Sequence, residues 1–113
     1  MDRTVYDTYL AILREELIPA MGCTEPIALA YGAARAREAL GCLPQRIVAR
    51  CSGNMIKNVR CVQIPNSGGL VGIPASVILG AVGGDAARQM EVLSAVTDDD
   101  RTLCLRLLEQ GIC

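Results

Sequence analysis

Apolar residues near the start of the chain recur at the spacing of an amphipathic helix. Within residues 4–17 they are Val5, Tyr9, Ile12, Leu13 and Leu17. Asp2 or Thr4 can cap this helix, and Pro19 ends it. The pattern therefore predicts a first helix with one apolar face.

A second helix is expected after a break in the pattern. Pro19 and Pro26 bracket Gly22, and this combination interrupts regular structure. Thr24 can cap the helix, Pro26 fits its first turn, and the alanine-rich residues 27–40 continue it until Gly41. This arrangement places Cys23 at a helix N-terminus.

The middle of the chain changes from helical periodicity to alternation. Residues 45–51 alternate apolar and polar positions, and residues 59–64 have the same character, so both are predicted to be strands. Between them, residues 52–58 are polar and contain a glycine, which predicts a turn or one short helical turn.

The last part of the chain is expected to be helical. A flexible loop over residues 65–69 precedes an apolar helix over 73–82, which begins near Pro74 and stops at Gly83. Asp85 can cap a helix through about residue 96, and Asp98 or Asp99 can cap a final helix over 101–110. The predicted fold is α+β and mostly helical, with helices packed on a small antiparallel strand pair. Residues 1–113 are expected to be one unit, the amino-terminal portion of a longer catalytic domain.

Composition and charge exclude several classes of protein. Eleven basic and twelve acidic residues give a net charge of -1, with no basic cluster, so nucleic acid is not an expected partner. The longest apolar stretch, residues 70–83, contains Pro74 and falls short of the roughly 20 residues that span a bilayer. No secretory signal precedes the first helix, and we expect a cytoplasmic protein without a membrane partner.

The cysteine pattern predicts thiols rather than a disulfide scaffold. Six cysteines are present in an aliphatic chain without a signal peptide, and none of them forms a C-x-x-C pair. A zinc or thiol-redox protein is therefore a weak alternative, and we assign no metal ligand. Four of the cysteines are expected to be small buried side chains: Cys42, Cys51, Cys61 and Cys104.

Cys23 is the first candidate for chemistry. A helix N-terminus stabilises a thiolate and is expected to lower the pKa of the thiol, which would make the sulfur a usable base or nucleophile. The chain contains no histidine, so a Cys–His pair cannot form within it. Glu25 is a second candidate, either as a proton acceptor or simply as an acid in the first helical turn.

Two loops are further candidates for substrate binding. Residues 52–58 carry two amides and a lysine that can hold a carboxylate, although a turn in which Asn54 bonds its own backbone fits the same residues. Residues 65–74 contain glycines whose N–H groups lead into a helix, as in an anion cradle. These glycines match neither the Walker nor the dinucleotide-binding pattern.

Four spaced blocks of sequence together resemble the L-cysteine desulfidase family, which is related to the α chain of the iron-sulfur L-serine dehydratases. The blocks are Pro-Ala-Met-Gly-Cys-Thr-Glu-Pro-Ile at 19–27, Asn-Met-Ile-Lys-Asn at 54–58, Ile-Pro-Asn-Ser-Gly-Gly-Leu-Val-Gly-Ile-Pro at 64–74 and Leu-Gly-Ala-Val-Gly-Gly at 79–84. The resemblance runs from the first helix to about residue 96.

The resemblance implies a fragment of a pyridoxal-independent lyase with a serine dehydratase α-chain-like fold. Such an enzyme uses a [4Fe-4S] cluster to release hydrogen sulfide, ammonia and pyruvate from L-cysteine. Cys23 matches the catalytic cysteine, and the cluster ligands are expected outside this chain, in a carboxy-terminal remainder. Glu25 stays a second catalytic candidate on the ground of its position alone. The residues expected to bind the amino-acid substrate are Thr24, Asn54, Lys57, Asn58, Asn66, Ser67, Gly68 and Gly69.

Three alternatives stay open at this point. L-Serine differs from L-cysteine only by oxygen for sulfur, so L-serine dehydratase activity fits the same residues. A non-catalytic interaction module fits a chain that lacks the cluster ligands, and we expect the fragment to be inactive alone. A homo-oligomer is a further alternative, because an apolar fragment can associate through exposed patches.

Overall fold

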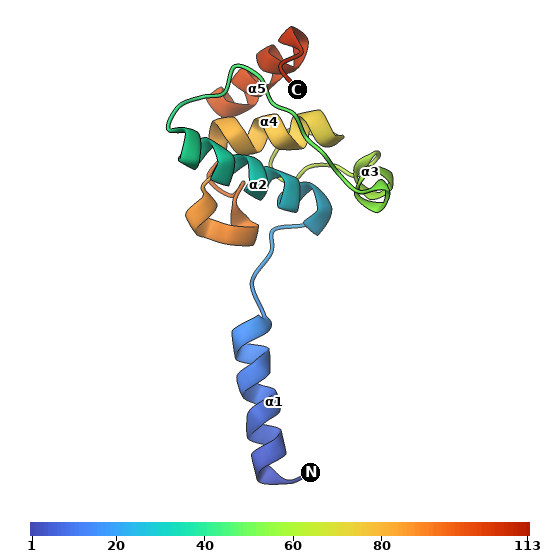
Figure 1. The fold of residues 1–113 in the computed structure, drawn as a ribbon, viewed down its shortest axis with the longest axis vertical. Helices are drawn as coiled ribbons and strands as arrows, with labels where there is room; N and C mark the ends of the chain where they lie inside the picture. The colour runs from blue at the N-terminus through green and yellow to red at the C-terminus, as the bar shows by residue number, and fades with distance from the viewer.

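The structure is a computed structural model that describes residues 1–113, and it is built from helices. In chain order these are α1 (Arg3–Glu16), α2 (Thr24–Leu40), α3 (Gly53–Val59), α4 (Ile73–Gly83), the 3₁₀ helix η1 (Ala86–Glu91) and α5 (Asp98–Gln110). No strand forms, and the only β contact is an isolated bridge between Gln63 and Val71. Figure 1 shows a cluster of helices from which α1 projects.

The core lies where α2 crosses α4. Every residue of α4 from Ala75 to Val82 is buried, which agrees with its apolar side chains on all sides. A Cβ atom added at Gly80 would lie 2.2 Å from the backbone oxygen of Ala30, so the two helix backbones are in direct contact. Only glycine permits this approach.

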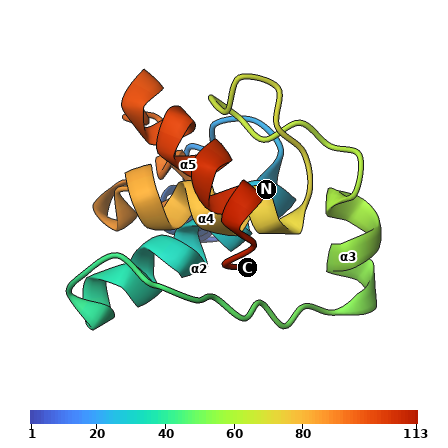
Figure 2. The same cartoon turned by 90° about the horizontal axis from the view of Figure 1, so that it is seen from above.

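Two further elements cover α4. Cys104 on α5 is fully buried, and its sulfur lies 3.8 Å from the Ala75 oxygen. The η1 segment and the turns after it bring Val92, Leu93 and Val96 into the same core. Figure 2 shows α5 lying across α4, with α2 beneath it.

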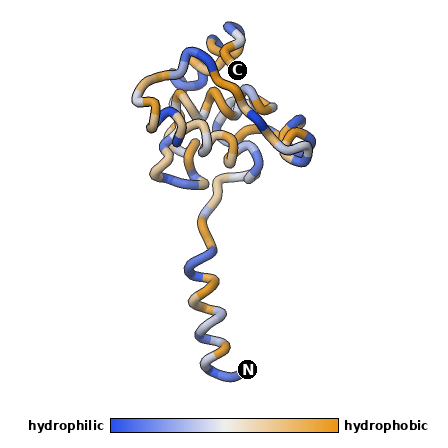
Figure 3. Tube along the Cα trace, viewed as in Figure 1, coloured by the Kyte–Doolittle hydropathy of each residue, from blue (hydrophilic) through white to orange (hydrophobic).

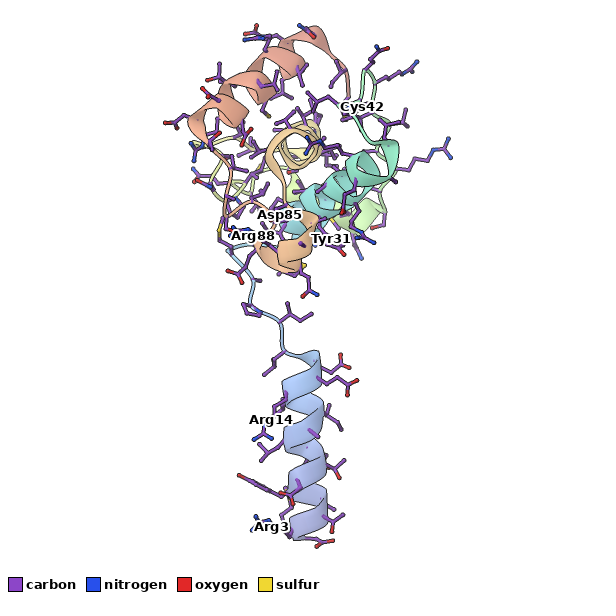
Figure 4. The ribbon with its side chains drawn as sticks, turned by 90° about the vertical axis from the view of Figure 1, so that its left-hand side faces the viewer. Arg3, Arg14, Tyr31, Cys42, Asp85 and Arg88 are labelled. Atoms are coloured by element: carbon purple, nitrogen blue, oxygen red, sulfur yellow. The ribbon has the colours of Figure 1, made fainter.

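Helix α1 has no part in this core. None of its residues is buried, and it lies apart from the helical cluster (Figures 1 and 3). Figure 4 shows Arg3 and Arg14 on this helix, away from the side chains of the helical cluster. The radius of gyration is 16.3 Å, whereas a compact chain of this length has about 13 Å.

The predicted antiparallel strand pair is wrong. Residues 45–51 form an extended segment, but they do not pair with residues 59–64. The polar run between them folds into α3, whose N-terminus is capped by the Ser52 hydroxyl accepting from the Met55 N–H at 3.2 Å. This helix takes in Val59 and separates the two segments. The α+β prediction is therefore corrected to an all-α fold.

The other helix boundaries lie closer to those predicted from the sequence. Asp2 caps α1 as expected, whereas Cys23 rather than Thr24 is the N-cap of α2. The helix predicted over 85–96 is a short 3₁₀ helix interrupted at Gln89, which has a φ of 54°. The final helix begins at Asp98, because Thr97 and Asp100 form a reciprocal capping box.

The apolar helices are short. None of the helices is both long enough and apolar enough to cross a membrane.

Candidate functional site

A tight turn places Cys23 at the start of α2. Gly22 precedes it with a φ of 87°, a backbone conformation that glycine adopts readily. A Cβ added at Gly22 would lie 2.8 Å from Pro65 Cγ, so this turn lies directly against the loop of residues 65–69. The expected catalytic cysteine and one of the expected substrate loops are therefore neighbours.

The Cys23 thiol and the Glu25 carboxylate form a pair. The thiol donates to Glu25 Oε2 at 3.1 Å, and both residues are half-buried. This bond, with the cost of burying a charged sulfur, raises the pKa of Cys23. The same bond lowers the pKa of Glu25, since the carboxylate is the acceptor.

The pKa of Cys23 is raised, whereas the sequence predicted that the helix N-terminus would lower it. A helix N-terminus alone would lower the pKa of the thiol, but a carboxylate two residues away outweighs it here. The proton consequently stays on sulfur at neutral pH, and the negative charge stays on Glu25. Once deprotonated, a sulfur with a raised pKa is a stronger base than an ordinary thiolate.

The side chain of Ser67 forms hydrogen bonds inside the neighbouring loop, residues 65–69. Its side chain is buried, donates to the Ile64 oxygen at 2.6 Å and accepts from the Leu70 N–H at 2.9 Å. Gly68 and Gly69 remain exposed, with φ values of 76° and 94°. The hydroxyl of Ser67 is thus engaged by the protein, and the glycines present the accessible backbone of the loop.

Asn66 ties the loop to the carboxy-terminal helices. Its side-chain nitrogen donates to the backbone oxygens of Leu93 and Val96, at 2.9 and 3.2 Å. Arg101 on α5 donates to the backbone oxygen of Asn66 at 2.9 Å and to its side-chain oxygen. Asn66 also has a φ of 56°, which asparagine tolerates better than most residues.

Arg101 was not singled out from the sequence. Its spacing from Asp98 indicates only a local ion pair, which is present, and nothing in the chain order indicates a bond to Asn66. The arginine nevertheless holds the loop that lies against the Cys23 turn.

The polar residues of α3 are separate from this cluster. Asn54, Lys57 and Asn58 are exposed, and their side chains form no hydrogen bond or ion pair. Helix α3 packs against α2, but no polar contact joins its side chains to Cys23, Glu25 or Thr24. Their role as substrate ligands stays a prediction.

The residues of this chain do not fit a [4Fe-4S] cluster. Such a cluster is held by several cysteine thiolates, and no three potential ligands converge anywhere in the described residues. All six cysteines are free thiols. Cys104 is buried as predicted and Cys51 is half-buried, but the burial predicted for Cys42 and Cys61 is wrong, since both are exposed. Figure 4 shows Cys42 just beyond the end of α2.

Comparisons with known proteins identify bacterial relatives. The chain is 48% identical over 99 residues to a UPF0597 protein of Treponema denticola, covering 88% of this chain and 23% of that protein. It is 47% identical over 109 residues to a UPF0597 protein of Lachnoclostridium phytofermentans, covering 96% and 26%. A UPF0597 protein of Desulfitobacterium hafniense is 51% identical over 96 residues, covering 85% and 22%.

The chain spans about a quarter of the length of these relatives. Their names give a family designation without an activity. No family model matches the chain. No solved structure matches it either.

Proposed function

We propose that this chain is the amino-terminal portion of a β-eliminating lyase that acts on L-cysteine. The observation that carries the proposal is the Cys23–Glu25 pair, which lies at a helix N-terminus beside an exposed glycine loop. The resemblance to the L-cysteine desulfidase family supports the same assignment. The overall reaction converts L-cysteine and water into pyruvate, ammonia and hydrogen sulfide.

In this proposal Cys23 moves the α-proton of the substrate. The sulfur must first lose its own proton to solvent, because the raised pKa of Cys23 and the lowered pKa of Glu25 keep that proton from resting on the carboxylate, which lies 3.1 Å away. The resulting thiolate is strongly basic, as removal of an α-proton requires. Glu25 is therefore assigned to set the protonation state of Cys23 and to keep its sulfur oriented.

The substrate carboxylate is assigned to the backbone groups around Gly68 and Gly69 and the N-terminus of α2. Free N–H groups at a helix N-terminus and in a glycine loop favour an anion. Lys57 on α3 is proposed to add a positive charge, with Asn54 and Asn58 beside it.

Residues outside this chain complete the proposed enzyme. The [4Fe-4S] cluster belongs to them in this proposal, because the cysteines described here do not converge. The fragment alone is then expected to be inactive. A reducing cytoplasm suits both free thiols and an iron-sulfur cluster.

The test uses a longer protein, made by joining this chain to the remaining three quarters of the Lachnoclostridium phytofermentans relative. It is purified without oxygen and assayed for sulfide and pyruvate from L-cysteine, with L-serine in parallel. Cys23→Ala should lower kcat by roughly 1,000-fold and Glu25→Gln by roughly 10-fold or more. Cys61→Ala, which removes an exposed thiol outside the site, should leave kcat unchanged.

The outcomes separate the candidate functions. Sulfide release that survives Cys23→Ala contradicts the assignment of the base. Pyruvate from L-serine without sulfide from L-cysteine favours the dehydratase alternative. A protein that carries its cluster and acts on neither amino acid overturns the proposal.

The assignment of Lys57 has its own test. Lys57→Met should raise the KM for L-cysteine at least about tenfold, because one charge-assisted bond to the carboxylate is lost. Arg60→Met removes a cation just after the same helix and serves as the matched control. An unchanged KM in Lys57→Met would remove this residue from the site.

A further inference from the structure

Residues 45–51 form an extended segment whose backbone is almost unpaired. The Ile47 N–H donates to the Ile112 oxygen at 2.7 Å. No other residue of the segment makes a backbone hydrogen bond, and no side chain bonds to it. Figure 2 shows the segment running alongside α2 toward α3. An exposed row of unpaired N–H and C=O groups is a template for another strand.

Most of this segment is exposed, and only Ile47 and Cys51 are half-buried. Ile47 packs against the core, whereas Val48 is 66% exposed. A strand added beside the segment would present its own side chains at every second residue, so it needs hollows to receive them.

Three hollows flank the segment, and Ile47 and Val48 line all of them. Their volumes are about 440, 240 and 320 Å³. The first extends to Ile112 and Cys113, the second to the α2 face around Gly32, and the third to the end of α2 at Leu40. Together they form an apolar trough beside an unpaired backbone.

We infer that residues 45–51 receive a β-strand from the polypeptide that follows residue 113 in the longer protein. Ile112 is already bonded to Ile47, so whatever follows residue 113 starts beside this segment. The relatives are about four times as long as this chain, which provides the necessary polypeptide. The inference rests on the proposed placement of this chain as an amino-terminal portion. It differs from the pairing with residues 59–64, which α3 prevents.

Hydrogen exchange of the backbone amides tests the strand. The amides of Val48, Ala49 and Arg50 should exchange almost freely in this chain, because none of them is hydrogen-bonded. In the longer hybrid protein, and in the unmodified Lachnoclostridium phytofermentans relative at the matched positions, the amides of Val48 and Arg50 should exchange at least about 100-fold more slowly. The N–H of Ala49 points to the opposite edge, where Ile112 bonds Ile47, so its exchange should change less. The native relative keeps the test valid where the hybrid fails to fold.

Two results would overturn the inference. One is exchange that is equally fast in the short and the long proteins. The other is protection that already appears in the short chain and grows with its concentration, because a second copy would then be the occupant. Hydrogen exchange and its dependence on concentration are both independent of catalysis. A protected segment in an inactive protein would therefore contradict the proposed function and leave the strand inference standing.

A substitution distinguishes strand pairing from simple burial. Val48→Pro removes an N–H that is unbonded in this chain, so the unfolding midpoint of the short chain should not change. In the longer protein the same substitution should restore fast exchange at residue 50, whose N–H lies on the same edge as that of residue 48. Val48→Thr keeps the N–H and the branched side chain and should retain the protection. Loss of protection in both variants would indicate burial of the side chain rather than pairing of the backbone.

Discussion

Helices α1 and α4 are both rich in apolar residues, but their surroundings are entirely different. Helix α4 is buried along residues 75–82, whereas α1 buries none of its side chains. Helix α4 has small residues where α2 crosses it, and Gly80 lets the two backbones meet. Helix α1 has one apolar face, and nothing in this chain covers that face. Periodicity predicts that a helix forms, but burial depends on the surface that its partner offers.

The largest loss in the free energy of unfolding is expected for a substitution where α2 and α4 meet. Gly80→Ala places a methyl group 2.2 Å from the Ala30 oxygen, and neither backbone can move without opening the core. The free energy of unfolding should fall by about 3 kcal/mol, at the upper end of overpacking effects. Urea unfolding followed by circular dichroism measures it.

Gly32→Ala on α2 is the matched control for Gly80→Ala. A Cβ at Gly32 meets nothing within 4 Å, and alanine is the better helix former. This variant should be stabilised by up to about 1 kcal/mol. If both variants were destabilised equally, close contact between α2 and α4 would not be the reason.

The next largest loss of stability is expected at Asn66, which connects the candidate site to the packed core. Asn66→Ala leaves the Leu93 and Val96 oxygens unbonded and removes the bond from Arg101 to the side-chain oxygen, while the bond from Arg101 to the backbone oxygen stays. The free energy of unfolding should therefore fall by about 2 kcal/mol. Asn66→Gly loses the same bonds but tolerates the positive φ. Its urea midpoint should lie between those of the parent and Asn66→Ala. A midpoint equal to that of the parent would show that the side-chain bonds contribute nothing.

Alkaline pH should weaken the packed core through Cys104. Burial raises the pKa of this thiol from 9.0 to about 11. The unfolded chain therefore loses this proton at lower pH than the folded chain, and stability is lost as pH rises from about 9 to 11. The loss should be about 2 kcal/mol in the parent.

Cys104→Ala isolates this contribution. The variant is less stable at neutral pH because a core side chain is shortened, but its stability should fall less steeply above pH 9. Cys61→Ala, at an exposed thiol, should keep the slope of the parent. Identical slopes in all three proteins would assign the alkaline loss to other groups.

The smallest effect is expected on α1. Ile12→Ala should change the free energy of unfolding by less than about 0.5 kcal/mol, because that side chain contacts no core residue. Ile78→Ala makes the same substitution in α4 at a fully buried position and should cost about 2 to 5 kcal/mol. A large loss in Ile12→Ala would show that α1 packs against the cluster in solution.

Local signals in the sequence predicted the principal helices. Asp2, Pro26, Gly41 and Pro74 mark the ends of α1, α2 and α4 to within a few residues. The turn at Gly22 also placed Cys23 correctly at a helix N-terminus. These signals work because capping and backbone restrictions act within a few residues of the chain.

The errors arose where the outcome depends on distant residues. Alternation over 45–51 correctly indicated an extended backbone, but alternation cannot supply the partner that a sheet requires. The pKa of Cys23 depended on the geometry of Glu25, and the bond from Arg101 to Asn66 joins residues 35 positions apart. The site residues themselves stay predictions until activity is measured.

The exposed connection between α1 and α2 is a site at which a protease can cut the chain into two products. Residues 17–20 are exposed and lie outside any helix, which is the conformation that proteases cut most readily. Cleavage there would release α1 as a free peptide. The Cys23–Glu25 pair and the whole buried core would remain together in the larger product, so a brief digestion would yield the candidate site on a smaller chain.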